Sequence, residues 1–527
     1  YAAAATRLGT MVDGGYEYKV RSYDWRFDHV REFDTCDECH DPHSLQVRIG
    51  SCAECHPDVG SVEDLMDARL LGSTKDYDGD GNANEGIFFE LEGLRSALLT
   101  AIQAYARDDI GTPIVYDKAA YPYFFVDTNG NGETDDDEAN YGNRYTSWTP
   151  RLLQAAYNYQ TSLKDPGGYT HGPKYHIQLL YDSIEDLDAQ AVEGLTRNDA
   201  GHFDGSSEAF RHWDEDGEVP GSCSKCHSDE GLPAFLDEGV SVSEPIANGL
   251  QCRTCHDAVP SYTLPTIAEV TFPSGAALAF SEDSSSNICL ECHQGRQSTF
   301  SVRDAVGEAG PDTVVDGLGF VNVHYFASGA TVFGSEAKGA YEYEGQSYAG
   351  ELVHPDSYDE CSECHDAHDL GVNVQACADC HPRAADGEGL RAIRIAEPDF
   401  DGDGDVDEGV AGEISTLRDT LYEAIQGYAS EVVGTAIVYD SHAYPYFFVD
   451  TNENGETDPD EANFGNRYTA WTPRLLKAGY NYHYVAKDPG AYAHNPVYII
   501  QVLHDSLTDL GDWAAIDLAD IVRPVGQ

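Results

Sequence analysis

The sequence predicts a mostly irregular fold with scattered α-helices and little β-structure, organised by an internally duplicated module. Among 527 residues, 51 glycines and 23 prolines leave only short apolar runs, which predicts long irregular segments between helices. The segment YPYFFVD at 121–127 recurs at 444–450, a shift of 323 residues. NRYTSWTPRLL at 143–153 recurs as NRYTAWTPRLL at 466–476 with the same shift. A repeat this long indicates two copies of one structural unit.

The repeat predicts three modules. Near the start of each copy the shift becomes 325, which places Cys36 on Cys361 and Cys52 on Cys377. The expected modules are a first copy at 1–186, an unrepeated centre at 187–325 and a second copy at 326–527. Residues 92–106 and 149–159 have the apolar spacing of helices. The Thr-Pro pair at the start of the second segment supplies an N-cap and a first helical residue.

All 14 cysteines lie in seven Cys-x-x-Cys-His motifs. This pattern is the attachment signature of c-type haem, in which both sulfurs bond to the porphyrin vinyl groups and the adjacent imidazole ligates the iron. The sequence therefore predicts a multihaem cytochrome c with a haem-dominated core, two haems in each copy and three in the centre. The attachment residues are Cys36, Cys39, His40, Cys52, Cys55, His56, Cys223, Cys226, His227, Cys252, Cys255, His256, Cys289, Cys292, His293, Cys361, Cys364, His365, Cys377, Cys380 and His381.

Three other interpretations of the cysteine pairs fit less well. With 20 histidines in 527 residues, a histidine would follow a zinc-knuckle pair by chance at roughly one site in twenty-six, whereas a histidine follows all seven pairs of this chain. Disulfides do not require a histidine at a fixed place, and thioredoxin-like chemistry needs one motif, not seven. Because c-type haem is attached outside the cytoplasm, we expect an extracellular or outer-surface protein, with the periplasm as the alternative.

The second axial ligand decides what each iron does. Two protein ligands give an electron carrier, whereas an open position can bind a substrate. Methionine is scarce, with only Met11 and Met66, but 13 of the 20 histidines lie outside the seven motifs. Bis-histidine haems are therefore expected. The predicted distal ligands are His29, His43, His202, His212, His324, His354 and His368, with His171 and His494, which also align in the repeat, as substitutes.

Acidic loops predict calcium as a second cofactor. Residues 127–138 and 450–461 match a twelve-residue calcium loop, with oxygen-bearing side chains at alternate positions, glycine at position 6 and glutamate at position 12. Loops starting at Asp76 and Asp399 lack that last glutamate, and Glu85 or Glu408 is the alternative ligand. We expect four structural calcium ions, one for each loop. The predicted ligands are Asp76, Asp78, Asp80, Asn82, Asp127, Asn129, Asn131, Glu133, Glu138, Asp399, Asp401, Asp403, Asp405, Asp450, Asn452, Asn454, Glu456 and Glu461.

The composition argues against several classes of protein. The chain has 93 acidic and 31 basic residues, so its formal net charge of −62 disfavours nucleic acids and anionic membranes as partners. No apolar run approaches the roughly 20 residues of a membrane span. A hydrophobic share of 41% argues against disorder. Because no leader-like segment follows Tyr1, we expect a mature exported protein.

Longer segments resemble a known family. The stretch AGHFDGSSEAFRHWDEDGEVPGSCSKCH, followed by CHQGRQS, HYFASGATVFGSEAKGAYEY and YIIQVLHDSL, resembles the large multihaem c-type cytochromes of metal-reducing bacteria. That family includes outer-surface cytochromes that polymerise into electron-carrying filaments. The resemblance implies a continuous line of closely spaced bis-histidine haems, in which one iron takes its distal histidine from the adjoining subunit.

The sequence therefore predicts a non-enzymatic electron-transfer protein that passes electrons to redox partners or extracellular acceptors. We expect a homopolymer with head-to-tail contacts, although repetition alone does not require such assembly. The alternative is a multihaem reductase of a small oxyanion, which needs one open-site haem and a cationic pocket. Basic residues are scarce, which disfavours such a pocket. A calcium-stiffened surface protein with purely structural haem is a third interpretation.

Overall fold

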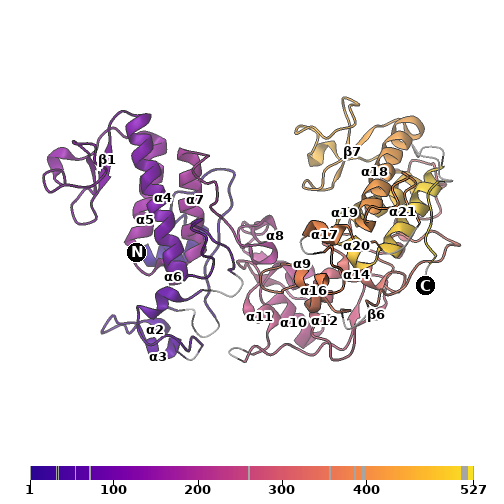
Figure 1. The fold of residues 1–527 in the computed structure, drawn as a ribbon, viewed down its shortest axis with the longest axis horizontal. Coiled ribbons are helices and arrows are strands. Elements are labelled where there is room, and N and C mark those ends of the chain that lie inside the picture. The colour runs from indigo at the N-terminus through magenta and orange to yellow at the C-terminus, as the bar shows by residue number, and fades with distance from the viewer. Residues whose placement is uncertain are drawn as a thin grey trace. The chain divides into compact units, whose positions relative to one another are not determined.

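The computed structural model contains two compact units (Figure 1). The first unit comprises Tyr1–Leu264 with His368–Leu370, and the second comprises Pro265–Ala367 with Gly371–Gln527. The three-module division expected from the repeat stays a prediction. The structure describes residues 2–30, 33, 35–53, 55–69, 73–258, 261–354, 358–384, 387–394, 398–511 and 520–525.

Three packed helices form the core of the first unit (Figure 1). They are α4 (Ile87–Asp108), α5 (Pro150–Lys164) and α7 (Pro173–Leu187). Leu91, Leu94, Leu98 and Ile102 recur every three or four residues along α4, and all four are fully buried. This spacing places them in one stripe of a 3.6-residue helix, so α4 presents that stripe to its neighbours. Helix α4 covers the helix that the sequence predicts at 92–106.

Local sequence also sets the start of α5. The hydroxyl of Thr149 accepts a hydrogen bond from the backbone N–H of Leu152 at 3.1 Å, and Pro150 occupies the first helical position. Both features match the N-cap expected from the Thr-Pro pair. A short antiparallel hairpin precedes α5 and is formed by β1 (Ile114–Tyr116) and β2 (Phe124–Val126), with Ile114 opposite Val126.

The second unit contains the same order of elements. Its three core helices are α18 (Val410–Tyr428), α19 (Pro473–Ala486) and α21 (Pro496–Leu510). Its hairpin consists of β7 (Ile437–Tyr439) and β8 (Phe447–Val449), with Ile437 opposite Val449. The aligned residues of the two hairpins are 323 positions apart, as in the sequence repeat. Trp471 is fully buried in this unit, where its ring packs edge-on against Phe447.

The remaining elements are short. The other helices are α1 (Ala2–Leu8), α2 (Cys36–Cys39), α3 (Ile49–Cys52), α6 (Gly168–His171), α8 (Glu208–Arg211), α9 (Gly221–His227), α10 (Gly231–Glu238), α11 (Cys252–Cys255), α12 (Asn287–His293), α13 (Thr299–Val306), α14 (Ser328–Phe333), α15 (Cys361–Cys364), α16 (Val374–Ala378), α17 (Gly387–Arg391) and α20 (Ala491–His494). The other strands are β3 (Glu218–Val219), β4 (Glu244–Pro245), β5 (Val270–Thr271) and β6 (Ala277–Leu278). The predicted fold class, mostly irregular with scattered helices and little strand, is confirmed.

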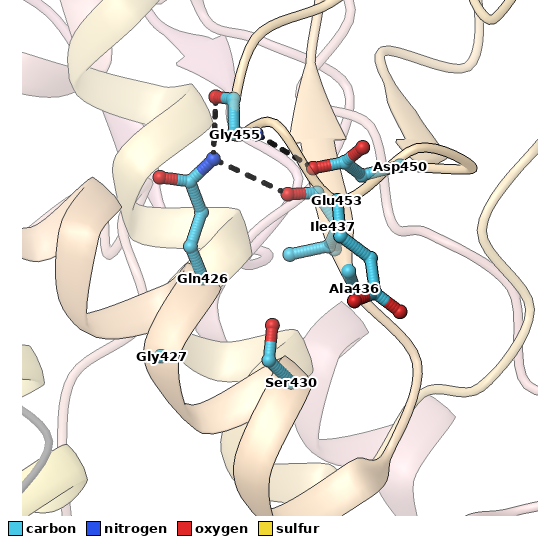
Figure 2. A pocket seen from close by; sticks show the side chains of 8 residues that line it. All are labelled: Gln426, Gly427, Ser430, Ala436, Ile437, Asp450, Glu453 and Gly455. Atoms are coloured by element: carbon cyan, nitrogen blue, oxygen red, sulfur yellow. Dashed lines mark hydrogen bonds between the residues drawn. The ribbon is translucent and has the colours of Figure 1, made fainter.

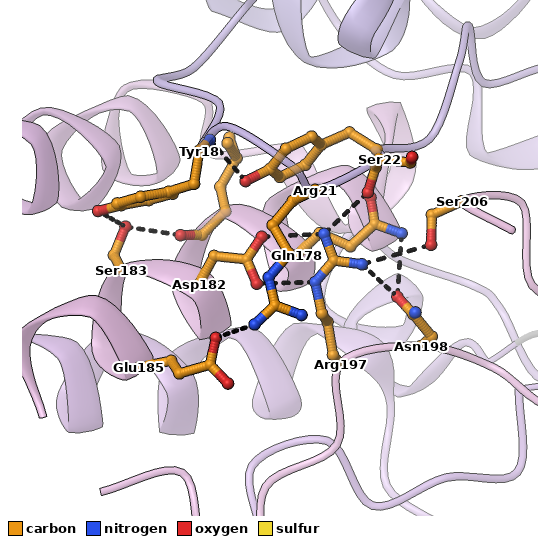
Figure 3. A network of polar contacts seen from close by, with 12 residues as sticks. Tyr18, Arg21, Ser22, Gln178, Asp182, Ser183, Glu185, Arg197, Asn198 and Ser206 are labelled. Carbon is orange, nitrogen blue, oxygen red and sulfur yellow. Dashed lines mark hydrogen bonds and ion pairs between the residues drawn. The ribbon is translucent and has the colours of Figure 1, made fainter. Parts of the chain in front are cut away.

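A polar network ties the N-terminal segment of the first unit to α7 (Figure 3). The guanidinium of Arg197 forms a two-point ion pair with the buried Asp182 of α7, at 2.7 and 2.9 Å. The same guanidinium donates to the carbonyl of Ser22 at 2.8 Å. In the second unit Arg523 pairs with Asp505 at 2.9 Å and donates to the carbonyl of Ser347. Each network fixes the segment that leads to a predicted distal histidine, His29 or His354.

Candidate haem-ligating sites and acidic loops

Five of the seven Cys-x-x-Cys-His motifs have both cysteines in a short helix, and α3 and α16 end at or just after the first cysteine of the other two. In the first motif the N–H of His40 donates to the carbonyl of Cys36 at 2.9 Å, and His256 and His365 make the same bond to Cys252 and Cys361. The turn places the two thiols on one helix face and directs the histidine away from its end. All 14 cysteines are free, and none is fully buried. Free, accessible thiols are what covalent attachment of haem requires and what a disulfide framework would not leave.

Five of the seven motif histidines face a second histidine. The ring centres are 6.1 Å apart for His40 and His171, 6.2 Å for His56 and His29, 6.3 Å for His256 and His368, 6.2 Å for His365 and His494, and 6.4 Å for His381 and His354. These separations vary by only 0.3 Å, although the pairs come from different parts of the sequence.

The common separation is the one that a shared metal requires. A metal–imidazole bond is about 2.0 Å long. An imidazole nitrogen lies about 1.1 Å from the centre of its ring, given C–N bonds near 1.33 Å. Two imidazoles on opposite sides of one iron therefore have ring centres about 6.2 Å apart. The five pairs thus fit bis-histidine haem, and stacking contacts between bare imidazoles would be closer.

Hydrogen bonds at Nδ1 orient several of the motif histidines. Nδ1 of His256 lies 2.9 Å from the carbonyl oxygen of Tyr262, and Nδ1 of His227 lies 2.7 Å from that of Ala209. Because a carbonyl only accepts, Nδ1 carries the proton and Nε2 presents its lone pair. That is the tautomer of a histidine that ligates a metal through Nε2.

Buried carboxylates orient the two histidines that the sequence offers as substitutes. Nδ1 of His171 lies 2.8 Å from Asp165, and Nδ1 of His494 lies 2.7 Å from Asp488. Both carboxylates are nearly inaccessible. Burial alone would raise the pKa of Asp488, but the facing His494 lowers it more, so the net pKa lies below the usual value. A charged carboxylate behind each ring raises its basicity as a ligand.

The structure places the sequence-predicted distal histidines unevenly. His29, His354 and His368 each face a motif histidine, as the five pairs show. His43 is exposed, and within the described ranges its ring faces no other histidine. His202 packs on Phe203, His212 packs on Trp213, and His324 has a left-handed φ of 82°. The assignment of every distal ligand stays a prediction, and His227 and His293 are the motif histidines outside the five pairs.

Consecutive motifs lie close together in the second unit. The thiol of Cys361 donates a hydrogen bond to Cys289, which lowers the pKa of Cys289, although burial opposes the shift. The pKa of His293 is lowered by burial and, among smaller causes, by the nearby imidazoles of His494 and His365. Further along, burial and the neighbouring Cys377 raise the pKa of Cys364. The fifth, sixth and seventh motifs are thus successive neighbours.

In the first unit the first two motifs are neighbours in the same way. Burial raises the pKa of the Cys39 thiol, and the nearby Cys52 raises it further. This juxtaposition repeats that of Cys364 and Cys377 in the second unit. Each unit therefore holds its own pair of repeated motifs close together, through contacts within that unit.

Comparison with curated proteins finds relatives in Geobacter sulfurreducens. The C-type polyheme cytochrome OmcB of strains PCA and DL-1/KN400 is 27% identical over 406 residues, which cover 64% of this chain and 50% of OmcB. The C-type polyheme cytochrome OmcC of strain PCA is 25% identical over 420 residues, which cover 69% of this chain and 52% of OmcC. This similarity supports a multihaem c-type cytochrome. The chain spans about half the length of these relatives.

Two other comparisons give no match. No protein-family model matches the chain, and no solved structure resembles it at a significant level. Among the described residues, no helix combines the length and apolarity that crossing a bilayer would need.

The acidic loops bring carboxylates together in two clusters. Ligand-type oxygens of Asp78, Asp80 and Glu85 lie within 4.8 Å of one another, and so do those of Asp401, Asp403 and Glu408. The sequence identifies all six residues. It misses Glu90 and Glu413, which extend the clusters from the first turns of α4 and α18 and are completely buried.

The loops with a glutamate at position 12 have a different arrangement. Glu138 accepts hydrogen bonds from the backbone N–H and the hydroxyl of Thr128, at 2.6 and 2.7 Å, and Glu461 does the same with Thr451. Asp450 accepts from the N–H of Gly455, whose carbonyl accepts from Gln426 (Figure 2). These carboxylates close their own loops, and their gathering around calcium stays a prediction.

Proposed function

We propose that this chain is an electron-transfer protein whose seven c-type haems pass single electrons along the molecule to a redox partner or an extracellular acceptor. The five imidazole pairs with a nearly constant separation are the observation on which the proposal depends. An iron with imidazole on both sides has no position for a substrate, so it can only gain and lose an electron. The relatives are named polyheme cytochromes, which supports the same conclusion.

The residues of the chain have separate tasks in this function. The cysteines hold each porphyrin covalently, and the motif histidine and its partner hold the iron. Haem supplies the redox change when bound. The backbone carbonyls and the Asp165 and Asp488 carboxylates keep the imidazole rings in one orientation, so that little rearrangement accompanies each electron step.

The test is a haem count combined with spin-state spectroscopy of the purified protein. Mass measurement should give the polypeptide plus seven haems, and electron paramagnetic resonance should show low-spin iron. A high-spin haem that binds nitrite or sulfite would support the oxyanion reductase and contradict the proposal. The haems attached at His227 and His293 are where such a signal would arise, because their distal ligands are not assigned.

We further propose that the chain assembles as a head-to-tail homopolymer at the outer cell surface or outside it. His368 faces His256 in the first unit, but its repeat counterpart His43 is exposed and faces no histidine among the described residues. In this proposal His43 ligates the iron of a haem in an adjoining copy. Electron microscopy tests it directly: fibres of haem-loaded protein are expected, and a monodisperse monomer at all concentrations would contradict it.

Calcium is the second cofactor that we propose, bound in the four acidic loops as a structural ion. Oxygen ligands at alternate positions suit a hard cation, and four calcium ions would offset 8 of the 62 net negative charges. Metal analysis of the dialysed protein should find calcium. Its complete absence would contradict this part of the proposal and leave the haem function unaffected.

A further inference from the structure

The strongest unexplained feature of the second unit is a group of carboxylates with too few counter-charges. Five of them surround the start of α18: Asp399, Asp401, Asp403, Glu408 and Glu413. The guanidinium of Arg394 pairs with Glu413 at 2.7 Å, and its two terminal nitrogens also donate to the carbonyls of Glu408 and Pro398. The ion pair that this cation forms is with Glu413, and among the described residues no basic side chain forms an ion pair with Asp401, Asp403 or Glu408.

Two oxygens of the cluster are buried without any donor. Asp401 is only 3% exposed, and its Oδ2 atom has no hydrogen-bond partner. The neighbouring carboxylate of Asp399 could bond to it only if one of the two were protonated. The Oε1 atom of Glu408 is also buried without a partner. A buried carboxylate oxygen without a donor is strongly disfavoured unless the group takes up a proton or a cation lies against it.

The loop backbone is already arranged around these side chains. Asp399 accepts from the N–H groups of Gly402 and Gly404, at 2.7 and 2.8 Å, and Asp401 accepts through Oδ1 from Asp403 at 3.2 Å. Gly404 has a φ of +93°, which permits the turn. The chain thus curls so that alternate carboxylates converge, and Asp401 and Asp403 each use only Oδ1 for these backbone bonds.

Glu413 fixes this loop to the helix. Its Oε2 atom accepts from the N–H groups of Phe400 and Asp401, at 2.7 and 2.9 Å. In the first unit Glu90 accepts from Tyr77 and Asp78 at 2.8 and 3.1 Å and pairs with Arg69. The two buried glutamates are therefore positioning residues that hold the loop against the first turn of its helix.

From this geometry we infer that Asp401, Asp403 and Glu408 bind one divalent hard cation, calcium, and that Asp78, Asp80 and Glu85 form the equivalent site. This inference deepens the proposed calcium function, since it assigns the ligands in loops that lack a glutamate at position 12. Calcium is favoured over magnesium because these carboxylates lie on a curled loop and one helix end, where irregular coordination is tolerated. Bound calcium joins the loop to α18 and stabilises that unit.

The test uses haem-loaded full-length protein and calcium itself as the probe. Isothermal titration after removal of bound metal should show calcium binding, and the E408Q variant should lose one binding event or weaken it by at least tenfold. The matched control is E423Q, which removes the same charge from an exposed position of the same helix and should leave every calcium event unchanged. A parallel titration with magnesium should show at least tenfold weaker binding.

Thermal unfolding provides a second readout that does not depend on fitting binding curves. Calcium should raise the unfolding temperature of wild type and E423Q more than that of E408Q, and the Soret band before heating should be the same in all three proteins. Equal calcium responses in E408Q and E423Q would overturn the site assignment while leaving calcium binding elsewhere intact. If none of the three proteins bound calcium and the haem count were normal, both calcium proposals would be overturned. The proposed electron-transfer function would be unaffected.

Discussion

Replacing His494 by alanine should convert one haem from low spin to high spin. The ring centres of His494 and His365 are 6.2 Å apart, which matches the separation of about 6.2 Å expected for two imidazoles on one iron. Alanine would remove one of the two proposed axial nitrogens and keep the proposed covalent attachment through Cys361 and Cys364. We therefore expect a protein with unchanged haem content and one open coordination position.

The size of the effect follows from the number of motifs. With the seven haems proposed from the seven motifs, about one seventh of the iron should become high spin, and the Soret band should show the shift of that one haem. Electron paramagnetic resonance of the oxidised protein measures this fraction directly. Added imidazole should then bind to the opened site and restore the low-spin spectrum, which identifies the lost ligand as an imidazole.

The matched control is His442→Ala, because His442 is an exposed loop histidine whose side chain is 93% accessible. This variant should keep the wild-type spectrum. The reasoning would be refuted if H494A stayed fully low spin and bound no added imidazole. The same result would mean that the pairing of His365 with His494 in the structure does not correspond to ligation.

Three further predictions concern other parts of the molecule. His368→Ala should produce the same one-haem spin change in monomers and polymers. His43→Ala should produce this spin change only under conditions where wild type polymerises. A spin change in monomeric H43A would contradict intermolecular ligation. Burial places the pKa of His483 well below its usual value, so as the pH falls the unfolded chain is protonated before the folded one. The free energy of unfolding should therefore fall by about 1.4 kcal/mol per pH unit below about pH 6.5. H483Q, which introduces the residue type found at the aligned Gln160, should flatten this slope in denaturant titrations at several pH values, and an unchanged slope would exclude His483 as its source. Leu98→Ala should cost about 2–5 kcal/mol, measured by chemical unfolding of the first unit, and a loss below 1 kcal/mol would show that this position of α4 is not tightly packed.

Sequence patterns predict what is determined locally. The Thr149 cap and the stripe on α4 depend on residues within two helical turns, and both are found in the structure. The haem motifs are equally local. The distal histidines are not, because a ligand must be brought to its iron by packing between distant segments. His43 is three residues from His40 and therefore near it in sequence, but His171, 131 positions away, is the histidine that faces it.

The acidic loops show a second limit of pattern matching. A twelve-residue template that starts at Asp76 or Asp399 ends at the first residue of α4 or α18. It therefore cannot include Glu90 or Glu413, which lie three residues further on. A usable signal was present, since each glutamate lies in the first turn of an apolar helix that directly follows an acidic loop. Its burial and its contacts with the loop backbone depend on the path of the chain after the helix starts, which the template does not describe.

The hydrogen bond between Cys289 and Cys361 has a consequence for conduction. If haem is attached as proposed, the two sulfurs would belong to different macrocycles, and two porphyrin edges would lie close together there. Tunnelling across such a junction is fast, and current through a series of steps is limited by the slowest one. In the proposed function the resistance would therefore arise at wider gaps, and changes at this junction should leave the overall current nearly constant.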